Sequence, residues 1–219
     1  GLDNPGFRNR LESVWGFKVR NANYGVTDVF CNFAGQTADC DDLHFMALDI
    51  LHPELIDPES AEVLPWQEGR RGELVLTHMQ RDCQPLVRFR TGDIIQLTGT
   101  GRASCGRTAP RFRVVGRADD MVVVRGINAF PTQIAATLHS FPELNGEYRI
   151  VLDGPGPYDV LPIEVELENN RQIGAGLERA IEQRLKSDIG ITSRLTLLPA
   201  NSFPRMEGKT RRIIRKDGA

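Results

Sequence analysis

The order of strand and helix signals in the C-terminal half of the chain constrains its fold more than any other feature. From about residue 119 onward, apolar β-branched runs alternate with two segments of helical periodicity. In chain order these are MVVV at 121–124, PTQIAATLHS at 131–140, YRIVL at 148–152, IEVELE at 163–168, AGLERAIEQRLKSDIG at 175–190, RLTLL at 194–198 and a basic final strand, TRRIIR, at 210–215. This β-α-β-β-α-β order predicts the split βαβ arrangement of a small α+β sandwich.

Side-chain periodicity supports both helices. Apolar residues form one stripe in each segment: Ile134, Leu138 and Phe141 in the first, and Leu177, Ile181, Leu185 and Ile189 in the second. Pro131 stands where a first helical turn tolerates proline, and Gly190 stands where a C-terminal cap is expected. In IEVELE the apolar residues alternate with glutamates, which predicts one core face and one solvent face for that strand.

The segment before residue 117 has a different pattern of secondary-structure signals. Residues 21–97 read as short strands and turns, and the loop TGTGRASCGRTAP at 98–110 leads into another strand. We therefore expect a β-rich first domain over 1–117 and a smaller domain over 118–219. The chain begins without methionine, inside a helix-like stretch, so we expect it to be part of a longer polypeptide.

Charge and hydropathy exclude several classes of protein. The 27 basic and 29 acidic residues give a net charge of -2, so no bulk attraction to nucleic acid or anionic membrane is expected. No apolar run is long enough to span a bilayer, and the first residues lack the apolar core of a signal peptide. A cytoplasmic location is therefore expected.

Two motifs in the first domain suit a nucleotide site. YGVTD at 24–28 sets an aromatic ring, a hydroxyl and a carboxylate beside a glycine turn; alone it could equally be a surface turn. FRTGD at 89–93 ends a strand with a glycine and an acid that can accept hydrogen bonds from a ribose diol. GRADD at 116–120 and the turn RGINAFP follow in the same order.

Together with the terminal RMEGKTRR at 205–212, these motifs resemble successive motifs of the adenylate-forming acyl-CoA synthetase superfamily. The hairpin IDPESAEVLPWQEGRRGE at 56–73, the CGRT loop and GINAFPTQIA are most similar to the phenylacetate-CoA ligase branch. The similarity runs from about Tyr24 to Arg215. It implies that 1–117 is the C-terminal part of a large adenylate-forming domain, and that 118–219 is a small mobile domain.

The resemblance also implies a two-step reaction. A carboxylic acid first attacks ATP to give an acyl-adenylate, and CoA then displaces AMP. By position, Tyr24 and Gly25 line the adenine site and Thr27 contacts phosphate. Asp28 stands where the family usually has a Mg²⁺-binding glutamate, a departure that shortens the reach by one methylene.

The remaining site residues are carried over in the same way. Asp93 matches the acid that holds the ribose hydroxyls, and Arg117 matches an arginine that contacts ribose or phosphate. Asp119 occupies the hinge position, and Gly126 matches the glycine that lines the CoA channel. Lys209 matches the lysine that offsets charge during adenylation. Singly, Arg117 with Asp119 could be a salt-bridged turn, and Lys209 could belong to a solvated basic run.

The cysteines leave a metal question open. Some relatives in this branch hold a structural zinc with cysteine and histidine from loops that correspond to those of Cys40, His44 and Cys105. A closed site needs four ligands, and Ala103 stands where a further cysteine is common, so Cys31 or a water would complete it. Free cysteines are the alternative. Cys83 has no expected role beyond structure.

Other functions remain open at this stage. The expected partners are a small carboxylic acid, ATP and CoA, with no nucleic acid or membrane partner; a homodimer is an open alternative. A noncatalytic binding module that kept the fold is the second hypothesis. RNA binding is a third, but it requires exposed aromatics on central strands, and those strands offer only Tyr148. The acid is not readable; the resemblance favours an aryl or arylacetic acid.

Overall fold

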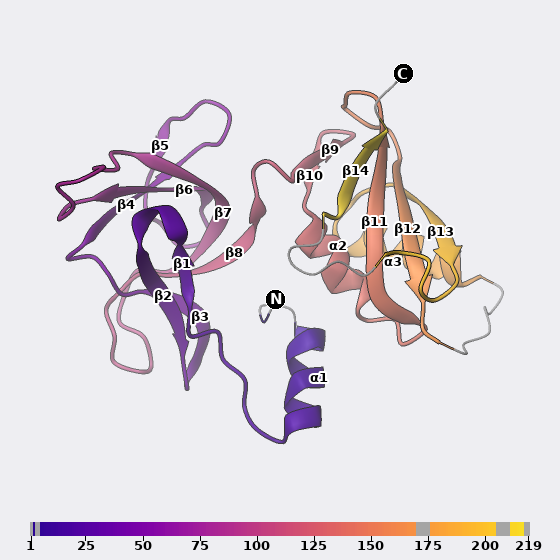
Figure 1. The fold of residues 1–219 in the computed structure, drawn as a ribbon, viewed down its shortest axis with the longest axis horizontal. Helices are drawn as coiled ribbons and strands as arrows, with labels where there is room; N and C mark the ends of the chain where they lie inside the picture. The colour runs from indigo at the N-terminus through magenta and orange to yellow at the C-terminus, as the bar shows by residue number, and fades with distance from the viewer. Residues whose placement is uncertain (1, 3–4, 170–175, 205–210, 217–219) are drawn as a thin grey trace. The chain divides into compact units, whose positions relative to one another are not determined.

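The computed structural model describes residues 2, 5–169, 176–204 and 211–216 (Figure 1). They form two compact units, Gly1–Asp119 and Asp120–Ala219. Strands dominate both units and helices are few, so the expected α+β class is confirmed. Among the residues that the structure describes, no helix is long and apolar enough to cross a membrane.

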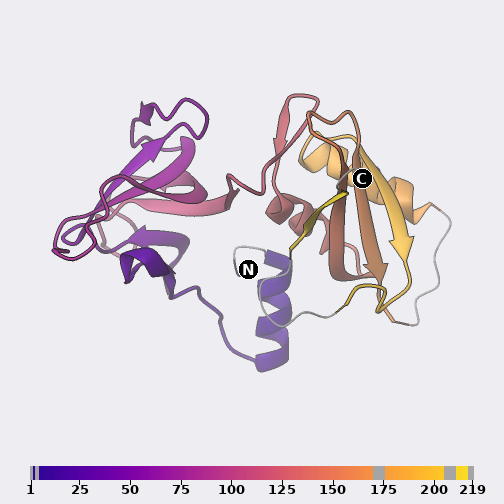
Figure 2. The ribbon, with the colours of Figure 1, turned by 45° about the horizontal axis from the view of Figure 1, so that its top comes forward.

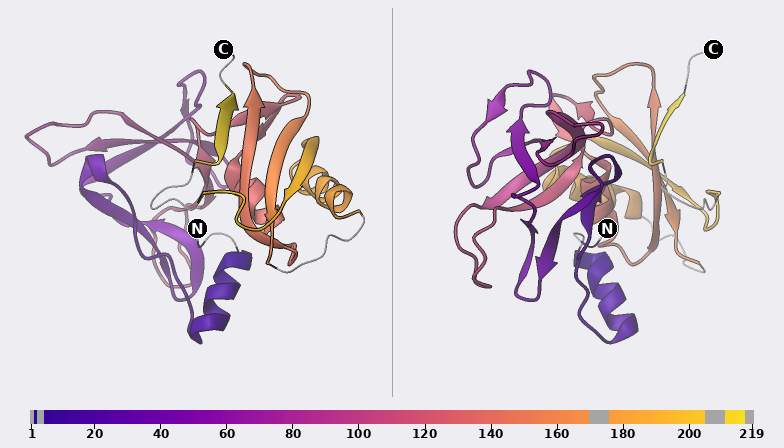
Figure 3. Two further views of the ribbon diagram at one scale, coloured as in Figure 1. Left: turned by 45° about the vertical axis from the view of Figure 1, so that its right-hand side comes forward. Right: turned by 60° about the vertical axis from the view of Figure 1, so that its left-hand side comes forward.

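The first unit is built on one antiparallel sheet of eight strands with the order β1-β2-β3-β8-β7-β6-β4-β5. Its elements are α1 (Pro5–Trp15), β1 (Tyr24–Val26), the 3-10 turn η1 (Thr27–Val29), β2 (Cys31–Thr37), β3 (Cys40–Phe45), β4 (Leu51–Ile56), β5 (Val63–Leu64), β6 (Arg71–His78), β7 (Phe89–Gly99) and β8 (Arg111–Arg117). The sheet curves strongly (Figure 3), and strands from both of its ends share one core. Phe33, Phe45 and Phe112 are the largest side chains buried there.

The second unit begins with a hairpin of β9 (Val122–Val124) and β10 (Ile127–Ala129), which pair only with each other as strands. There follow α2 (Pro131–Leu138), β11 (Leu144–Asp153), β12 (Leu161–Leu167), α3 (Leu177–Asp188), β13 (Ser193–Leu198) and β14 (Ile213–Lys216). The last four strands form a sheet with the order β13-β12-β11-β14. Figure 2 shows both helices on one face of this sheet.

The sandwich differs in one respect from the expected strand order. The run at 121–124 lies in the separate hairpin, and the final basic strand β14 takes the edge beside β11, to which it is parallel. The hairpin is short because Arg125 and Gly126 turn the chain back with φ of 49° and 78°. A two-residue turn with positive φ suits an antiparallel hairpin and leaves no room for a crossover to the larger sheet.

The predicted helix stripes are confirmed. Ile134, Leu138, Ile181 and Leu185 are all buried against the sheet. Pro131 is the first residue of α2, and Gly190, with φ of 89°, follows the end of α3. The alternation in β12 is correct for Ile163, Val165 and Leu167, but the expectation of a wholly solvent-facing opposite side is wrong at Glu166, which is 0% exposed.

Candidate nucleotide site

Tyr24 begins β1 and packs its partly buried ring against the core of the first unit. The ring meets Phe33 and Phe112 edge-on, with centroids 5.2 Å and 5.6 Å away. Its hydroxyl donates a hydrogen bond to Asp93 Oδ2 over 2.6 Å. The structure therefore joins the two motifs YGVTD and FRTGD through these two side chains.

Asp93 lies opposite Arg117 in the β7–β8 ladder. Arg117 Nη1 is 3.3 Å from Asp93 Oδ1, so the two carboxylate oxygens of Asp93 face different donors. The backbone amide of Asp93 donates to Thr91 Oγ1. Gly92, between them, has φ of 75°, and a Cβ there would lie 2.7 Å from Arg117 Nη2. Gly92 lies within β7, where its positive φ favours glycine and where an added Cβ would have to displace the guanidinium of Arg117.

Arg117 also holds Asp119. Its Nε lies 2.8 Å from Asp119 Oδ1 and its Nη2 lies 3.2 Å from Oδ2, a bidentate pair. These hydrogen bonds from Arg117 lower the pKa of Asp119 below its usual value. The salt-bridged turn considered from sequence is therefore present, and the same guanidinium extends it to Asp93.

Thr27 and Asp28 form the start of η1 and are exposed. Gly25 precedes them where the chains of β1 and β2 come close, since a Cβ would lie 2.4 Å from the carbonyl oxygen of Cys31. Gly25 is thus needed for strand pairing. Arg81 donates to the carbonyl oxygen of Asp28 over 2.7 Å and lies over the ring of Phe30, with its Cζ 4.5 Å from the ring centroid.

Two further residues, Glu73 and Arg90, support the site and were missed from sequence. Glu73 of β6 is 2% exposed, and its Oε1 accepts a hydrogen bond from the amide of Gly92 over 3.1 Å. Its other oxygen pairs with Arg90 Nε at 3.0 Å. An acid within the apolar run GELVLTHM was the available signal, because a buried carboxylate requires partners.

The other expected residues lie elsewhere. Gly126 is in the second unit, at the β9–β10 turn; a Cβ there would meet no atom within 4 Å, and only its positive φ favours glycine. Lys209 lies outside the described residues. The structure therefore brings together Tyr24, Asp93, Arg117 and Asp119 within the first unit.

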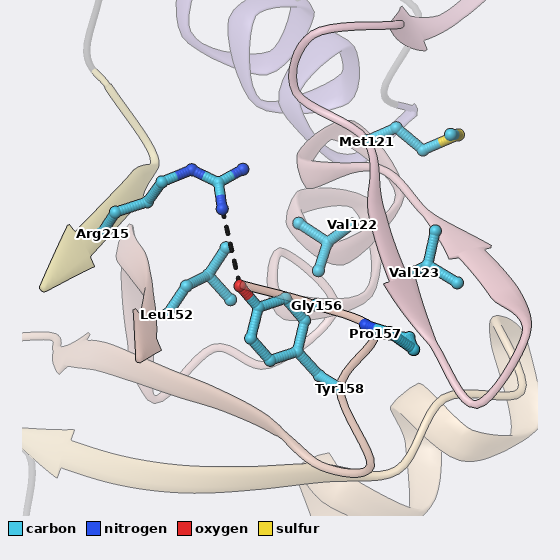
Figure 4. A pocket seen from close by; sticks show the side chains of 8 residues that line it. All are labelled: Met121, Val122, Val123, Leu152, Gly156, Pro157, Tyr158 and Arg215. Carbon is cyan, nitrogen blue, oxygen red and sulfur yellow. Dashed lines mark hydrogen bonds between the residues drawn. The ribbon is translucent and has the colours of Figure 1, made fainter. Parts of the chain in front are cut away.

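The second unit has a surface pocket of about 280 Å³ near the start of β9. Arg215 of β14 and Tyr158 meet at this pocket, with Arg215 Nη1 3.5 Å from the Tyr158 hydroxyl oxygen, and Leu152 and Val122 lie on either side of that contact in the view of Figure 4. Its lining is completed by Met121, Val123, Gly156 and Pro157. No motif of the sequence predicts a pocket here.

The candidate zinc ligands do not fit a closed zinc site. His44 Nε2 and Cys105 Sγ are 3.9 Å apart, but no group of three or more His, Cys, Asp or Glu side chains that could hold a metal ion occurs among the described residues, which include Cys31 and Cys40. Burial, with a smaller effect of Asp49, raises the pKa of Cys31, whereas hydrogen bonds, first of all that with the backbone of Arg107, lower the pKa of Cys105.

The position of Tyr148, the aromatic residue considered for RNA stacking, is also clear from the structure. Tyr148 is buried and donates its hydroxyl proton to the carbonyl oxygen of Pro131 over 2.6 Å. Its ring therefore packs in the core and cannot stack on a base.

Comparison with known proteins agrees with the motifs. The family model of the AMP-binding enzyme C-terminal domain matches residues 126–216. The phenylacetate-coenzyme A ligase of Thermus thermophilus is 34% identical over 94% of this chain and 50% of its own length. The Escherichia coli enzyme of the same name is 32% identical over 76% of this chain and 38% of its own.

Solved structures show the same relationship. The crystal structure of 2-hydroxyisobutyryl-CoA ligase in complex with 2-HIB-AMP has a TM-score of 0.85 and 30% identity, and the match covers 99% of this chain and 46% of that one. This chain thus spans about half the length of the relatives that it matches. It belongs to the phenylacetate-CoA ligase branch of the adenylate-forming acyl-CoA synthetase superfamily, and it corresponds to the C-terminal half of those enzymes.

Proposed function

We propose that this chain is the C-terminal half of an AMP-forming ligase that joins an aryl or arylacetic acid to CoA. The connected side chains Tyr24, Asp93, Arg117 and Asp119 carry the proposal. Asp93 lies within β7 and not at the strand end that the sequence suggested, and its carboxylate faces two fixed donors, which suits an acid that binds the two hydroxyls of a ribose. The names of the relatives, phenylacetate-coenzyme A ligases, support the substrate class.

The reaction has two balanced steps. In the first, a carboxylate oxygen of the acid attacks the α-phosphorus of ATP, the bond to the bridging oxygen breaks, and pyrophosphate leaves. In the second, the CoA sulfur attacks the acyl carbon and AMP leaves with the electron pair of the broken bond. The thiol proton passes to solvent.

In this proposal Asp93 accepts hydrogen bonds from the ribose, and Tyr24 and Arg117 hold its carboxylate in place. Each carboxylate oxygen can accept a second hydrogen bond, so the two internal donors leave capacity for the sugar. Tyr24 keeps its ring edge-on to Phe33 and Phe112. Its part in the adenine site is therefore to position Asp93 and to close one side of the site.

Asp28 fits a magnesium ion that arrives with ATP. It is a single exposed carboxylate at the turn that also carries Thr27. Magnesium in nucleotide sites is usually held by one or two carboxylates together with phosphates and waters, so one acid suffices. The ion would neutralise phosphate charge, while Thr27 would donate a hydrogen bond to a phosphate oxygen.

The second unit supplies the mobile part of the proposed enzyme. Rotation about Asp119 would bring Lys209 to the α-phosphate for the first step and the Gly126 turn to the CoA arm for the second. A compartment with ATP and free CoA, the cytoplasm, suits this activity. The chain alone lacks the half of the relatives that precedes it, and we expect it to turn over nothing by itself.

Acid-dependent release of AMP and pyrophosphate tests the proposal. A polypeptide that carries this chain after an upstream half should release pyrophosphate with phenylacetate, and Lys209→Ala should slow that step by about 10²-fold or more. A noncatalytic module that kept the fold would release none with any acid. Robust turnover by the chain alone would contradict its assignment as half of the enzyme.

A further inference from the structure

Glu166 is the buried acid of the second unit. It lies on β12 between Val165 and Leu167 and is 0% exposed, on the side of the strand where its neighbour Glu164 is partly exposed. Burying a carboxylate is costly unless hydrogen bonds replace its water. The hydrogen-bond partners of Glu166 therefore indicate which part of the structure its carboxylate stabilises.

At least three donors converge on Glu166, and two of them are backbone amides of one loop. The amide of Asn201 donates to Oε2 over 3.2 Å, and the amide of Phe203 donates to Oε1. Asn145 Nδ2, from β11, donates to Oε2 over 2.7 Å and orients the carboxylate. Asn201 has φ of 65°, a conformation that the loop maintains while both amides point at the same acid.

The side chain of Phe203 also holds the loop in place. Phe203 is 9% exposed, and the guanidinium carbon of Arg149 lies 4.8 Å from its ring centroid. Arg149 in turn pairs with Glu164. The loop that follows β13 is therefore held in place at Phe203.

The chain is anchored again just after Lys209. Arg212 Nη1 lies 2.7 Å from Glu147 Oε2 and donates to the carbonyl oxygen of Tyr148 over 3.0 Å. Ile213 then begins β14 and pairs with Ile150. The described residues on the two sides of Lys209 are thus both held, Phe203 by Glu166 and Arg212 by Glu147.

We propose that Glu166 is a positioning residue for Lys209: its carboxylate fixes the start of the segment from which the lysine reaches the α-phosphate. This rests on the proposed function, in which Lys209 acts in the first step only. Loss of the anchor should therefore slow adenylation selectively. A carboxylate that only stabilises the fold would affect both half-reactions alike.

Hydrogen exchange on the chain itself tests the anchor without any activity. In Glu166→Gln the side-chain NH₂ faces amide donors, so exchange at Asn201 and Phe203 should accelerate by about 10-fold or more. Glu182→Gln is the matched control. Glu182 Oε1 accepts a hydrogen bond of 2.9 Å from the amide of Leu195, which is not part of this loop. Unchanged exchange at 201 and 203 in Glu166→Gln would overturn the anchor.

The half-reactions test the consequence, in a polypeptide that carries this chain and releases pyrophosphate. Glu166→Gln should slow acyl-adenylate formation by about 10- to 100-fold, because small displacements of a charged group cost that much, while thioester formation from supplied acyl-adenylate changes less than about 2-fold. Equal losses in both steps, or none, would overturn the positioning role. Glu182→Gln should leave both steps unchanged.

Two further variants separate the possible failures. If Lys209→Ala leaves adenylation intact, the proposed function of the lysine is wrong, whatever Glu166 does. If Lys209→Ala abolishes adenylation and Glu166→Gln does not slow it selectively, only the positioning role is wrong. Should Glu166→Gln not fold, Asn145→Asp decides, because it removes the donor to Glu166 and keeps the oxygen that accepts the amide of Glu147. A selective loss of adenylation then supports the role, and an equal loss in both steps overturns it.

Discussion

The hydroxyl of Tyr24 donates to Asp93 Oδ2 over 2.6 Å, although 69 residues separate them in the chain. This contact fixes one oxygen of the acid proposed to hold ribose, and Arg117 faces the other. The sugar-binding group is therefore oriented before any nucleotide arrives, which reduces the entropy lost on binding.

Removing the Tyr24 hydroxyl should weaken nucleotide binding without disturbing the core. Tyr24→Phe keeps the ring contacts and deletes one hydrogen bond to a charged group, so we expect about 1–3 kcal/mol less stability of the first unit, by urea unfolding. In a polypeptide that binds AMP, its Kd, measured by calorimetry, should rise about fivefold, which corresponds to about 1 kcal/mol. Tyr158→Phe, whose hydroxyl bonds to the carbonyl oxygen of Gly154 in the other unit, is the control and should leave the Kd unchanged.

Gly92→Ala should displace Arg117. The added Cβ would lie 2.7 Å from Nη2, and φ of 75° is unfavourable for alanine. Backbone strain accounts for about 1 kcal/mol, and the clash should add to it and also weaken AMP binding. Gly69→Ala is the matched control, because Gly69 has φ of 83° with nothing within 4 Å of its Cβ position. Equal destabilisation in the two variants, with AMP affinity unchanged in both, would contradict a clash with Arg117.

Glu73→Gln should loosen the part of β7 around Gly92 that presents Asp93. Glu73 is 2% exposed and accepts from both the Gly92 amide and Arg90, so the neutral amide would leave a donor facing a donor. We expect about 2 kcal/mol lower stability of the first unit, measured by urea unfolding. Glu54→Gln is the control. It neutralises the partner of Arg88, and because Glu54 is 18% exposed the change should cost less than about 1 kcal/mol.

Sequence patterns predicted the helices and several strands because burial there depends on local periodicity. Ile181 and Leu185 repeat at the helical period and both are buried. Glu166 could not be predicted in this way: its strand alternates regularly, and its carboxylate is covered by groups distant in sequence, the loop at Asn201 and Phe203 and the side chain of Asn145. The hairpin of β9 was missed for a similar reason, since a short apolar run does not specify which sheet it joins.

The candidate site shows the same division. The motif residues Tyr24, Asp93, Arg117 and Asp119 were identified from the sequence, but their connection depends on the β7–β8 register and on the sheet that returns β1 to the core. The candidate zinc ligands do not come together among the described residues. His44 lies beside Cys105, 61 positions along the chain, but Cys31 and Cys40 do not complete a group able to hold a metal. Such distances in space cannot be derived from the sequence.

Asp119 should contribute to stability in a pH-dependent way, and only weakly. Its pKa is lowered in the folded chain by hydrogen bonds from Arg117, so the stabilisation is present above the ordinary value of 3.8 and is lost as pH falls through the lower folded value. Because the Asp119 side chain is 66% exposed, solvent screening should limit the contribution to about 0.5 kcal/mol. Urea unfolding of Asp119→Asn should thus show about that loss at pH 7 and a progressively smaller loss as the pH falls below 3.8. In Arg117→Ala the same Asp119→Asn change should cost nothing at pH 7; a full loss in that background would show that the guanidinium is not the partner responsible.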